Sequence, residues 1–148
     1  MGLSLERISD HIEIANILTR YCYAVDDREW DAYRSLFTPD AVIDDRVTGG
    51  IQSGVEEHIQ YLKKALSKVV LSQHAISTIR IDVTGKSAFV RAHCSCPMVV
   101  DLGESKTGVF FQGLWYRNTV VLTHDGWKIS HLAEEGYWTY NMPPHFTF

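Results

Sequence analysis

The sequence predicts an α+β fold in which helices come first and an antiparallel sheet follows, with the helices packed on one face of a curved sheet. Apolar residues recur at helical spacing as far as Leu66, and with a period of two from Leu71 onward. The dipeptide Asp125–Gly126 is typical of a hairpin turn between two strands. Helices followed by a run of strands are characteristic of α+β domains.

Length and composition predict one domain that spans residues 1–148. The chain has 148 residues, of which 45% are hydrophobic, and this is enough to bury a core without disulfides or a structural metal. Charged residues make up 22% of the chain, as in ordinary globular proteins, so we expect neither a disordered nor a fibrous protein.

The first helix is expected to run from Ser9 to about Asp27, with Ser9 or Asp10 as its N-cap. At about 100° per residue, six apolar or aromatic side chains project to one side of this helix. That side is formed by Ile14, Ile17, Leu18, Tyr21, Cys22 and Val25.

Two shorter helices complete the helical part of the prediction. Glu29–Phe37 has inward-facing aromatic residues at helical spacing, and Pro39 is expected to stop it. Ser53 and Glu56 form the pattern of a capping box, which predicts a third helix that begins there and continues to about Leu66.

The strands are predicted from alternation and from turn residues. Hairpin turns are expected at Thr84–Lys86 and His124–Gly126, and a polar loop at Asp101–Gly108. A sheet curled over helices encloses a cavity, which is a usual place for a small-molecule site. The expected strands are Ala41–Asp45, Leu71–Val83, Ser87–Val100, Val109–Leu122 and Trp127–Glu135.

Charge and composition exclude several classes of partner. The net charge is −4 and no Lys or Arg cluster is present, so we expect no nucleic-acid partner. No apolar run approaches the roughly 20 residues that span a bilayer, so we expect no membrane insertion. The three cysteines are few and odd in number, and the N-terminal segment does not have the pattern of a signal peptide; together these features predict reduced thiols and a cytoplasmic protein.

Asp26 is the first candidate for chemistry. It projects at the edge of the apolar side of the first helix, whereas Asp27 projects with the polar side. A carboxylate turned toward a core needs a partner, and burial raises its pKa, which suits a general base or a group that orients one. The alternative is that Asp26 caps the end of the helix or contacts Arg28.

His74 is the natural partner for Asp26. It lies on a predicted strand face that mixes polar and apolar residues, as expected for a ligand-lined interior. A histidine paired with a carboxylate is a common proton-transfer unit, although a single strand histidine can also be structural. On a regular strand, Ile79, Ile81 and Val83 would share the face opposite to His74, and that face is apolar.

Tyr21 and the pair Asp44 and Asp45 are further candidates. Tyr21 projects on the apolar side of the first helix, where its hydroxyl could polarise a substrate oxygen or the ring could simply fill the core. Asp44 and Asp45 end the first strand, so alternation turns one of them inward and leaves open which one.

Residues of the long strands are expected to line a site for a small hydrophobic ligand, and we name His93, Phe111, Trp115 and Trp138 as candidates. Both faces of the strand Val109–Leu122 are apolar, which predicts cover on both sides and favours a homodimer or homotrimer. We expect no metal site, because His93 and its neighbours Cys94 and Cys96 project to opposite faces of a strand.

The chain resembles the SnoaL-like polyketide cyclase and dehydratase group of the nuclear transport factor 2-like superfamily. The resemblance spans nearly the whole chain and rests on three segments: ILTRYCYAVDDREWDAYRSLFTPDAVIDD, SQHAIS and HDGWKIS. Within the group, the chain is most similar to scytalone dehydratase, bile acid 7α-dehydratase and lindane dehydrochlorinase. The resemblance implies a cystatin-like cone, a strongly curved antiparallel sheet wrapped around helices, and catalysis without a metal or organic cofactor.

The resemblance also implies roles for particular residues. Asp26 and His74 match an aspartate–histidine pair in which the histidine removes a proton from carbon and the leaving group departs from the next carbon. Tyr21 matches a tyrosine that contacts a substrate oxygen. The implied activity is that of a dehydratase-like carbon–oxygen lyase acting on a small hydrophobic, cyclic and oxygenated substrate.

Two alternatives stay open. Ketosteroid isomerase shares the implied fold, and its tyrosine and aspartate match Tyr21 and Asp45, which suggests a proton-shuttle isomerase. Some related enzymes carry an arginine near the position of Tyr137–Thr139, where this chain has none. This difference keeps open a non-catalytic domain that binds a small ligand or a protein partner, in which His74 would not be bonded to Asp26.

Overall fold

The computed structural model describes residues 2–148 and confirms the α+β fold. Three α-helices in these residues accompany a seven-stranded sheet. The helices are α1 (Leu5–Asp26), α2 (Trp30–Ser35) and α3 (Val55–Ala65), and a short 3-10 turn, η1, covers Arg46–Thr48. The strands are β1 (Phe37–Asp44), β2 (Gln52–Ser53), β3 (Val69–Ser72), β4 (Ala75–Thr84), β5 (Ser87–Gly103), β6 (Lys106–Thr123) and β7 (Gly126–Tyr140).

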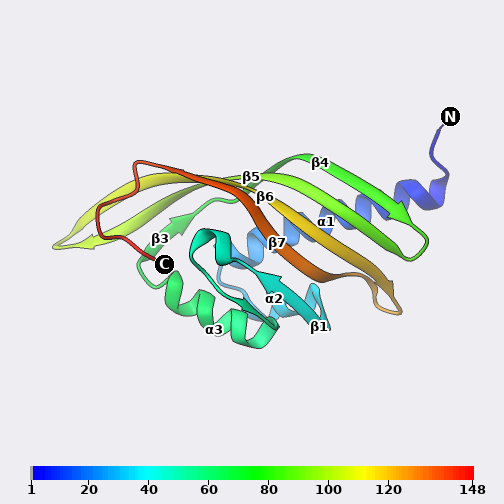
Figure 1. The fold of residues 1–148 in the computed structure, drawn as a ribbon, viewed down its shortest axis with the longest axis horizontal. Coiled ribbons are helices and arrows are strands. Elements are labelled where there is room, and N and C mark those ends of the chain that lie inside the picture. The colour runs from blue at the N-terminus through cyan, green and yellow to red at the C-terminus, as the bar shows by residue number, and fades with distance from the viewer. Residues whose placement is uncertain (1) are drawn as a thin grey trace.

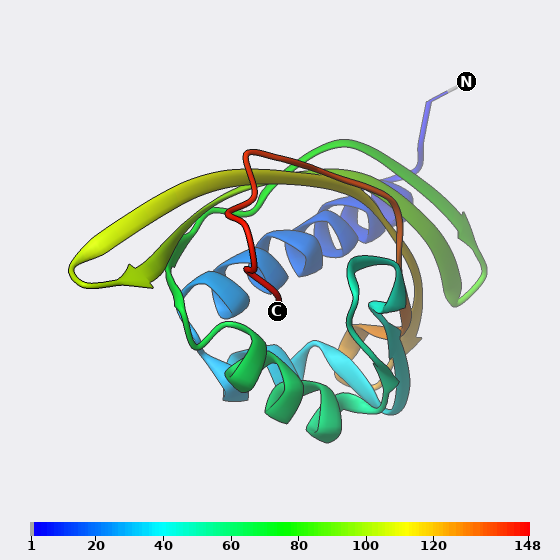
Figure 2. The same ribbon diagram turned by 60° about the vertical axis from the view of Figure 1, so that its left-hand side comes forward.

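The sheet is strongly curved and arches over the helices (Figure 1). Its strand order is β2-β1-β7-β6-β5-β3, and β4 pairs with β5 next to the end of β3. Figure 2 shows the long strands β5 and β6 passing over α1, with α3 across the open side of the arch. The pair β1 and β7 is parallel, and the other strand pairs are antiparallel, as predicted.

The core lies between α1 and the concave face of the sheet. All six side chains predicted to project from one side of α1 are buried, with Ile14 fully enclosed. On the sheet, the inward residues of β5 and β6 form the opposite wall, as expected for strands with one face on a core. The predicted amphipathic character of the first helix is therefore confirmed.

The predicted N-terminal caps are wrong. Helix α1 begins at Leu5 and its N-cap is Ser4, whose hydroxyl accepts a hydrogen bond from the Arg7 backbone nitrogen at 3.2 Å. The Asp10 carboxylate instead accepts a hydrogen bond from the Trp127 indole nitrogen at 3.0 Å. The capping box does not form either, because Ser53 belongs to β2 and Gly54 is the N-cap of α3.

Pro39 does not stop the second helix, because α2 already ends at Ser35 and Pro39 lies within β1. The segment Asp101–Gly108 is not a loop throughout. Strand β5 continues to Gly103 and β6 begins at Lys106, so only a tight turn joins them.

The strand predicted over Leu71–Val83 is interrupted. Strand β3 ends at Ser72 and β4 begins at Ala75, so His74 lies in the short connection between them. Within β4, Thr78 has a positive φ of 50° and the pairing with β5 shifts register between Ser77 and Arg80. Because this bulge resets the alternation, Ile79 is 41% exposed and does not share the inner face with Ile81 and Val83.

No helix among residues 2–148 is long and apolar enough to cross a membrane.

Candidate active site

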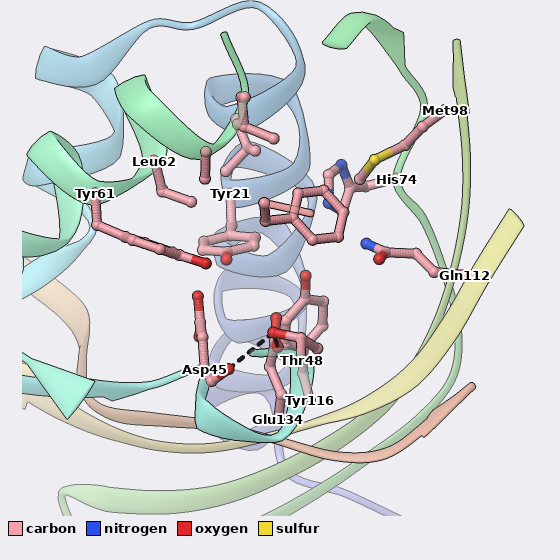
Figure 3. A pocket seen from close by; sticks show the side chains of 14 residues that line it. Tyr21, Asp45, Thr48, Tyr61, Leu62, His74, Met98, Gln112, Tyr116 and Glu134 are labelled. Atoms are coloured by element: carbon pink, nitrogen blue, oxygen red, sulfur yellow. Dashed lines mark hydrogen bonds between the residues drawn. The ribbon is translucent and has the colours of Figure 1, made fainter. Parts of the chain in front are cut away.

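A cavity opens on the concave side of the sheet, between α1, α3 and the inner strands (Figure 3). Its atom-free space is about 480 Å³, a volume that includes the open mouth. Polar side chains lie at both of its ends, with His74 at one end and Asp45 and Glu134 at the other (Figure 3). The lining residues are Tyr21, Val25, Asp45, Thr48, Tyr61, Leu62, Ala65, Leu66, His74, Met98, Gln112, Tyr116, Glu134 and Phe148.

Asp26 and His74 are held against each other at one end of this cavity. Asp26 is the last residue of α1, and the connection between β3 and β4 passes beside it. His74 Nδ1 lies 2.6 Å from Asp26 Oδ1, and the His74 backbone nitrogen donates to Asp26 Oδ2 at 2.8 Å. The Ser72 hydroxyl donates a third hydrogen bond to Asp26 Oδ1 at 2.6 Å. These three contacts fix the carboxylate and leave Nε2 as the ring nitrogen that Asp26 does not hold.

The environment of the pair favours its charged form. Burial raises the pKa of Asp26, but the hydrogen bonds and charge of His74 and the bond from Ser72 outweigh burial, so the net pKa is lowered. Burial lowers the pKa of His74, but the hydrogen bond that His74 donates to Asp26 and the contact with Cys96 outweigh burial and raise the pKa to about 10. The resting pair at neutral pH is therefore an imidazolium beside a carboxylate. The arrangement expected of a purely binding domain, with His74 apart from Asp26, is not observed.

Tyr21 belongs to a group of buried aromatic rings. Its ring centroid lies 5.5 Å from that of Tyr33 and 5.4 Å from that of Tyr116. Burial raises the pKa of all three hydroxyls well above the ordinary tyrosine value, so they stay protonated and can donate hydrogen bonds. Tyr21 and Tyr116 line the cavity, whereas Tyr33 lies behind them in the core.

Asp45 is the aspartate that faces inward. It is only 5% exposed and lines the cavity, whereas Asp44 forms an ion pair with Arg46 at 2.7 Å. Asp45 Oδ2 lies 2.9 Å from Nε2 of His58, a fully buried histidine of α3. The complete burial of His58 beside this carboxylate makes it part of the interior of the site.

Sequence reasoning missed Glu134, which lies near Asp45 at the end of the cavity away from His74 (Figure 3). Glu134 Oε2 is hydrogen-bonded to the Thr48 hydroxyl at 2.9 Å. The cavity is also lined by Tyr61, Gln112 and Thr48, which were not predicted to lie there. Alternation could have indicated Gln112 and Glu134, because each lies two residues beyond an apolar inward residue of its strand, Phe110 and Leu132.

Four residues predicted to line the site lie outside the cavity. His93 and Trp115 pair across β5 and β6 with ring centroids 5.2 Å apart, on the face of the sheet that turns away from the helices. Phe111 and Trp138 are 41% and 48% exposed on that same outer face. The inward residues of β6 are instead Phe110, Gln112, Leu114 and Tyr116.

The reason for these misplacements is structural. Both faces of β6 are apolar, so its pattern does not identify the inner one. In β7, Gly136 has a positive φ of 63°, and the register with β6 shifts between Gly113 and Trp115. This bulge moves Trp138 to the outer face, where its indole packs over Gly113, although simple alternation from Glu134 turns Trp138 inward.

Among the described residues, no group of three or more His, Cys, Asp or Glu side chains is arranged to hold a metal ion. The polar atoms that face the cavity are two carboxyl groups, an imidazole, an amide and several hydroxyls. Such a set can transfer protons and bind substrate oxygens.

Comparison with known proteins identifies the family and the fold of the chain. The sequence profile of the SnoaL-like domain matches residues 6–133. The uncharacterised protein Rv2910c of Mycobacterium tuberculosis is 37% identical over 132 residues, which are 89% of this chain and 88% of that protein. A proposed scytalone dehydratase from Novosphingobium aromaticivorans superposes with a TM-score of 0.80 at 17% identity, covering 95% of this chain and 93% of the other. A type 2 hexachlorocyclohexane dehydrochlorinase (LinA) superposes with a TM-score of 0.78 at 16% identity, covering 95% and 98%.

The two structural neighbours share the fold at low identity, and the profile match extends over most of the chain. The resemblance noted in the sequence is therefore confirmed, and the chain belongs to the family of SnoaL-like domains.

Proposed function

We propose that this protein is a dehydratase-like lyase that works without a cofactor and acts on a small hydrophobic, cyclic and oxygenated substrate. His74 is the base that removes a proton from carbon, and Asp26 orients it. The observation that carries this proposal is the 2.6 Å contact between His74 Nδ1 and Asp26 Oδ1 beside a cavity that His74 lines. Structural neighbours named as a dehydrochlorinase and a proposed dehydratase support the same class of elimination.

The step proceeds through the ring nitrogen that Asp26 leaves free. Neutral His74 Nε2 accepts a proton from a carbon next to a carbonyl group, and the C–H electron pair becomes the new carbon–carbon double bond. The leaving group departs from the neighbouring carbon with its bonding electrons. Asp26 then stabilises the imidazolium that has formed, and the hydroxyl of Tyr21 or Tyr116 donates to the carbonyl oxygen.

The test uses 3-hydroxycyclohexanone, which loses water to give cyclohex-2-enone, and follows the absorbance of the enone. We expect His74→Ala to lose about 10²–10⁴-fold in kcat/KM, the usual contribution of general base catalysis. His93→Ala is the matched control, because His93 lies on the outer face and bonds Ser77 there. An equal loss in both variants, or full activity in His74→Ala, contradicts the proposal.

An isomerase is the second candidate, because Asp45 is buried and lines the cavity. An isomerase with Asp45 as its base would convert cyclohex-3-enone to cyclohex-2-enone. It would lose this activity in Asp45→Asn and keep it in His74→Ala. The lyase predicts that His74→Ala removes enone formation from the hydroxyketone.

A further inference from the structure

The carboxyl group of Glu134 occupies an unusual position at the inner end of the cavity. Its Oε2 is 2.9 Å from the Thr48 hydroxyl, and the same hydroxyl is 2.8 Å from the backbone carbonyl oxygen of Asp45. A hydroxyl has one hydrogen to donate, so Thr48 cannot satisfy both oxygens fully. A proton on Glu134 Oε2 allows both hydrogen bonds to form, because Glu134 then donates to the Thr48 hydroxyl and Thr48 donates to the Asp45 carbonyl oxygen.

The surroundings of the two carboxyl groups also decide which one is ionised. Two carboxylates that share a poorly hydrated site do not both ionise, so one of them keeps a proton. The Asp45 carboxyl group has a nitrogen beside it, since Asp45 Oδ2 lies 2.9 Å from the fully buried His58 Nε2. The one hydrogen-bond partner of the Glu134 carboxyl among the described residues is the neutral Thr48 hydroxyl.

The surroundings of Glu134, taken together, favour a neutral carboxyl group there. Burial raises the pKa of Glu134 well above its ordinary value, and the Asp45 charge raises it further, whereas Thr48 and His74 lower it. The other titratable groups near it are Asp44 of β1, Tyr33 of α2, Cys94 of β5 and Tyr137 of β7, together with tyrosines of α1, α3 and β6. These tyrosines are Tyr21, Tyr61 and Tyr116.

Unpartnered polar atoms in the same cavity point to a polar ligand. Gln112 is 7% exposed, its side chain points into the cavity (Figure 3), and its Oε1 has no hydrogen-bond partner among the described residues. Asp45 Oδ1 is likewise buried without a hydrogen-bond partner. Because a buried polar atom without a partner is destabilising, these atoms indicate a site that is completed by polar groups of a ligand.

We propose that Glu134 is the general acid of the reaction, which donates a proton to the leaving hydroxyl group from the end of the cavity opposite His74. This inference rests on the proposed function and deepens it. It defines the substrate as a β-hydroxy carbonyl compound, with its acidic C–H directed at His74 and its hydroxyl directed at Glu134.

Atoms and charge are conserved in the proposed elimination. His74 Nε2 takes the proton from the α-carbon, the C–H electrons form the double bond, and the C–O bond of the β-hydroxyl breaks. The departing oxygen takes the proton of Glu134 and leaves as water. Thr48 then donates to the carboxylate oxygen that has formed, and the proton on His74 returns to Glu134 through solvent after the product leaves.

The first experiment measures protonation without any substrate. We would label the glutamate side-chain carboxyl carbons with carbon-13 and follow the Glu134 signal by NMR across pH, in the parent protein and in Asp45→Asn. We expect Glu134 to be protonated at pH 7 in the parent, and its titration midpoint to fall by about one unit or more in the variant. An ionised Glu134 at pH 7 in the parent overturns the proposal.

The second experiment separates acid catalysis from base catalysis with two substrates that share the same carbon acid. Hydroxide needs a proton to leave from 3-hydroxycyclohexanone, whereas acetate leaves 3-acetoxycyclohexanone without one. In Glu134→Gln, we expect the ratio of hydroxyl to acetate elimination to fall by about 10²-fold or more. In His74→Ala, both eliminations fall together, since both begin with loss of the same proton.

Glu135→Gln is the matched control, because Glu135 is the next residue and pairs with Arg91 at 2.7 Å on the outer face. The elimination ratio should not change in this control. An unchanged ratio in Glu134→Gln overturns the assignment of Glu134 and leaves the lyase intact. If the parent eliminates neither group, the proposed lyase activity on this substrate class fails, and the NMR titration still decides whether Glu134 holds the proton.

Discussion

Replacing Asp26 by Asn tests the central contact of the site through protein stability. The His74 and Asp26 side chains are 6% and 17% exposed, so the variant leaves a nearly buried imidazole without its charged partner. Breaking a buried ion pair by removing one member costs about 3–5 kcal/mol. Asp26 is partly open and Asn keeps one acceptor oxygen, so we expect the lower end, about 3 kcal/mol. For a chain of this size that loss corresponds to a fall in Tm of roughly 6–12 °C.

The pH dependence of this loss has a definite sign. Folding raises the pKa of His74 from 6.5 in the unfolded chain to about 10. Protonated His74 therefore stabilises the fold fully below pH 6.5, and this stabilisation is lost as the pH rises through about 10. The pKa of Asp26 is lowered from 3.8, so its contribution is complete above 3.8 and disappears as pH falls through the folded value. The difference in Tm between parent and variant should therefore be largest between about pH 4 and 6.5, and shrink toward pH 10.

Thermal unfolding by circular dichroism across this pH range provides the assay, with Asp27→Asn as the control because Asp27 is exposed. Nitrogen-15 NMR of His74 gives a direct second readout. We expect the pKa of His74 to fall by about one unit or more in Asp26→Asn. An unchanged pKa of His74, or equal melting curves for the two variants, would refute the coupling of Asp26 and His74.

Other predictions concern the rate, the sheet and the assembly. Because His74 must be neutral to accept a proton and its pKa is raised, kcat/KM for hydroxyketone elimination should keep rising above neutral pH; a plateau that begins near pH 6.5 contradicts this. A Cβ at Gly113 would lie 2.3 Å from the Trp138 indole, so Gly113→Ala should cost about 1–3 kcal/mol in unfolding free energy, measured by denaturant titration. Large apolar side chains, among them Phe111 and Trp138, stay exposed on the outer face of the sheet. Light scattering should therefore give two or three times the chain mass of 16.9 kDa, and the mass of a monomer contradicts the expected homodimer or homotrimer.

The parts of the fold that depend on local periodicity could be predicted from the sequence. The buried side of α1 follows from spacing alone, because every apolar residue of a regular helix keeps its direction. Helix ends could not be placed in this way. Ser4, Ser9 and Asp10 are all suitable caps, and tertiary contacts such as the bond from Trp127 to Asp10 determine which one caps the helix.

The direction of a candidate side chain could be inferred from the sequence on a regular helix but not on a bulged strand. Asp26 projects at the edge of the apolar side of a regular helix, so its inward direction could be inferred. Thr78 and Gly136 each shift the alternation of a long strand, and no local pattern identifies which residues follow a shift. Alternation alone therefore turns Trp138 toward the cavity. The two adjacent glutamates, Glu134 and Glu135, cannot be told apart by residue type.

The bulge at Gly136 also explains how β7 can carry a buried acid without exposing the core. Glu134 points into the cavity and Glu135 points out to Arg91, so two adjacent carboxyl groups acquire opposite environments. After the bulge, the alternation of β7 is shifted by one residue. Trp138 therefore covers Gly113 on the outer face and does not fill the cavity. The inner end of the cavity stays open beside Glu134, while His74 is held at the other end by a helix terminus. Because the base and the acid lie on separate elements at opposite ends of the cavity, loss of the proton from His74 can leave Glu134 protonated, and an elimination with proton transfer at both ends requires that state.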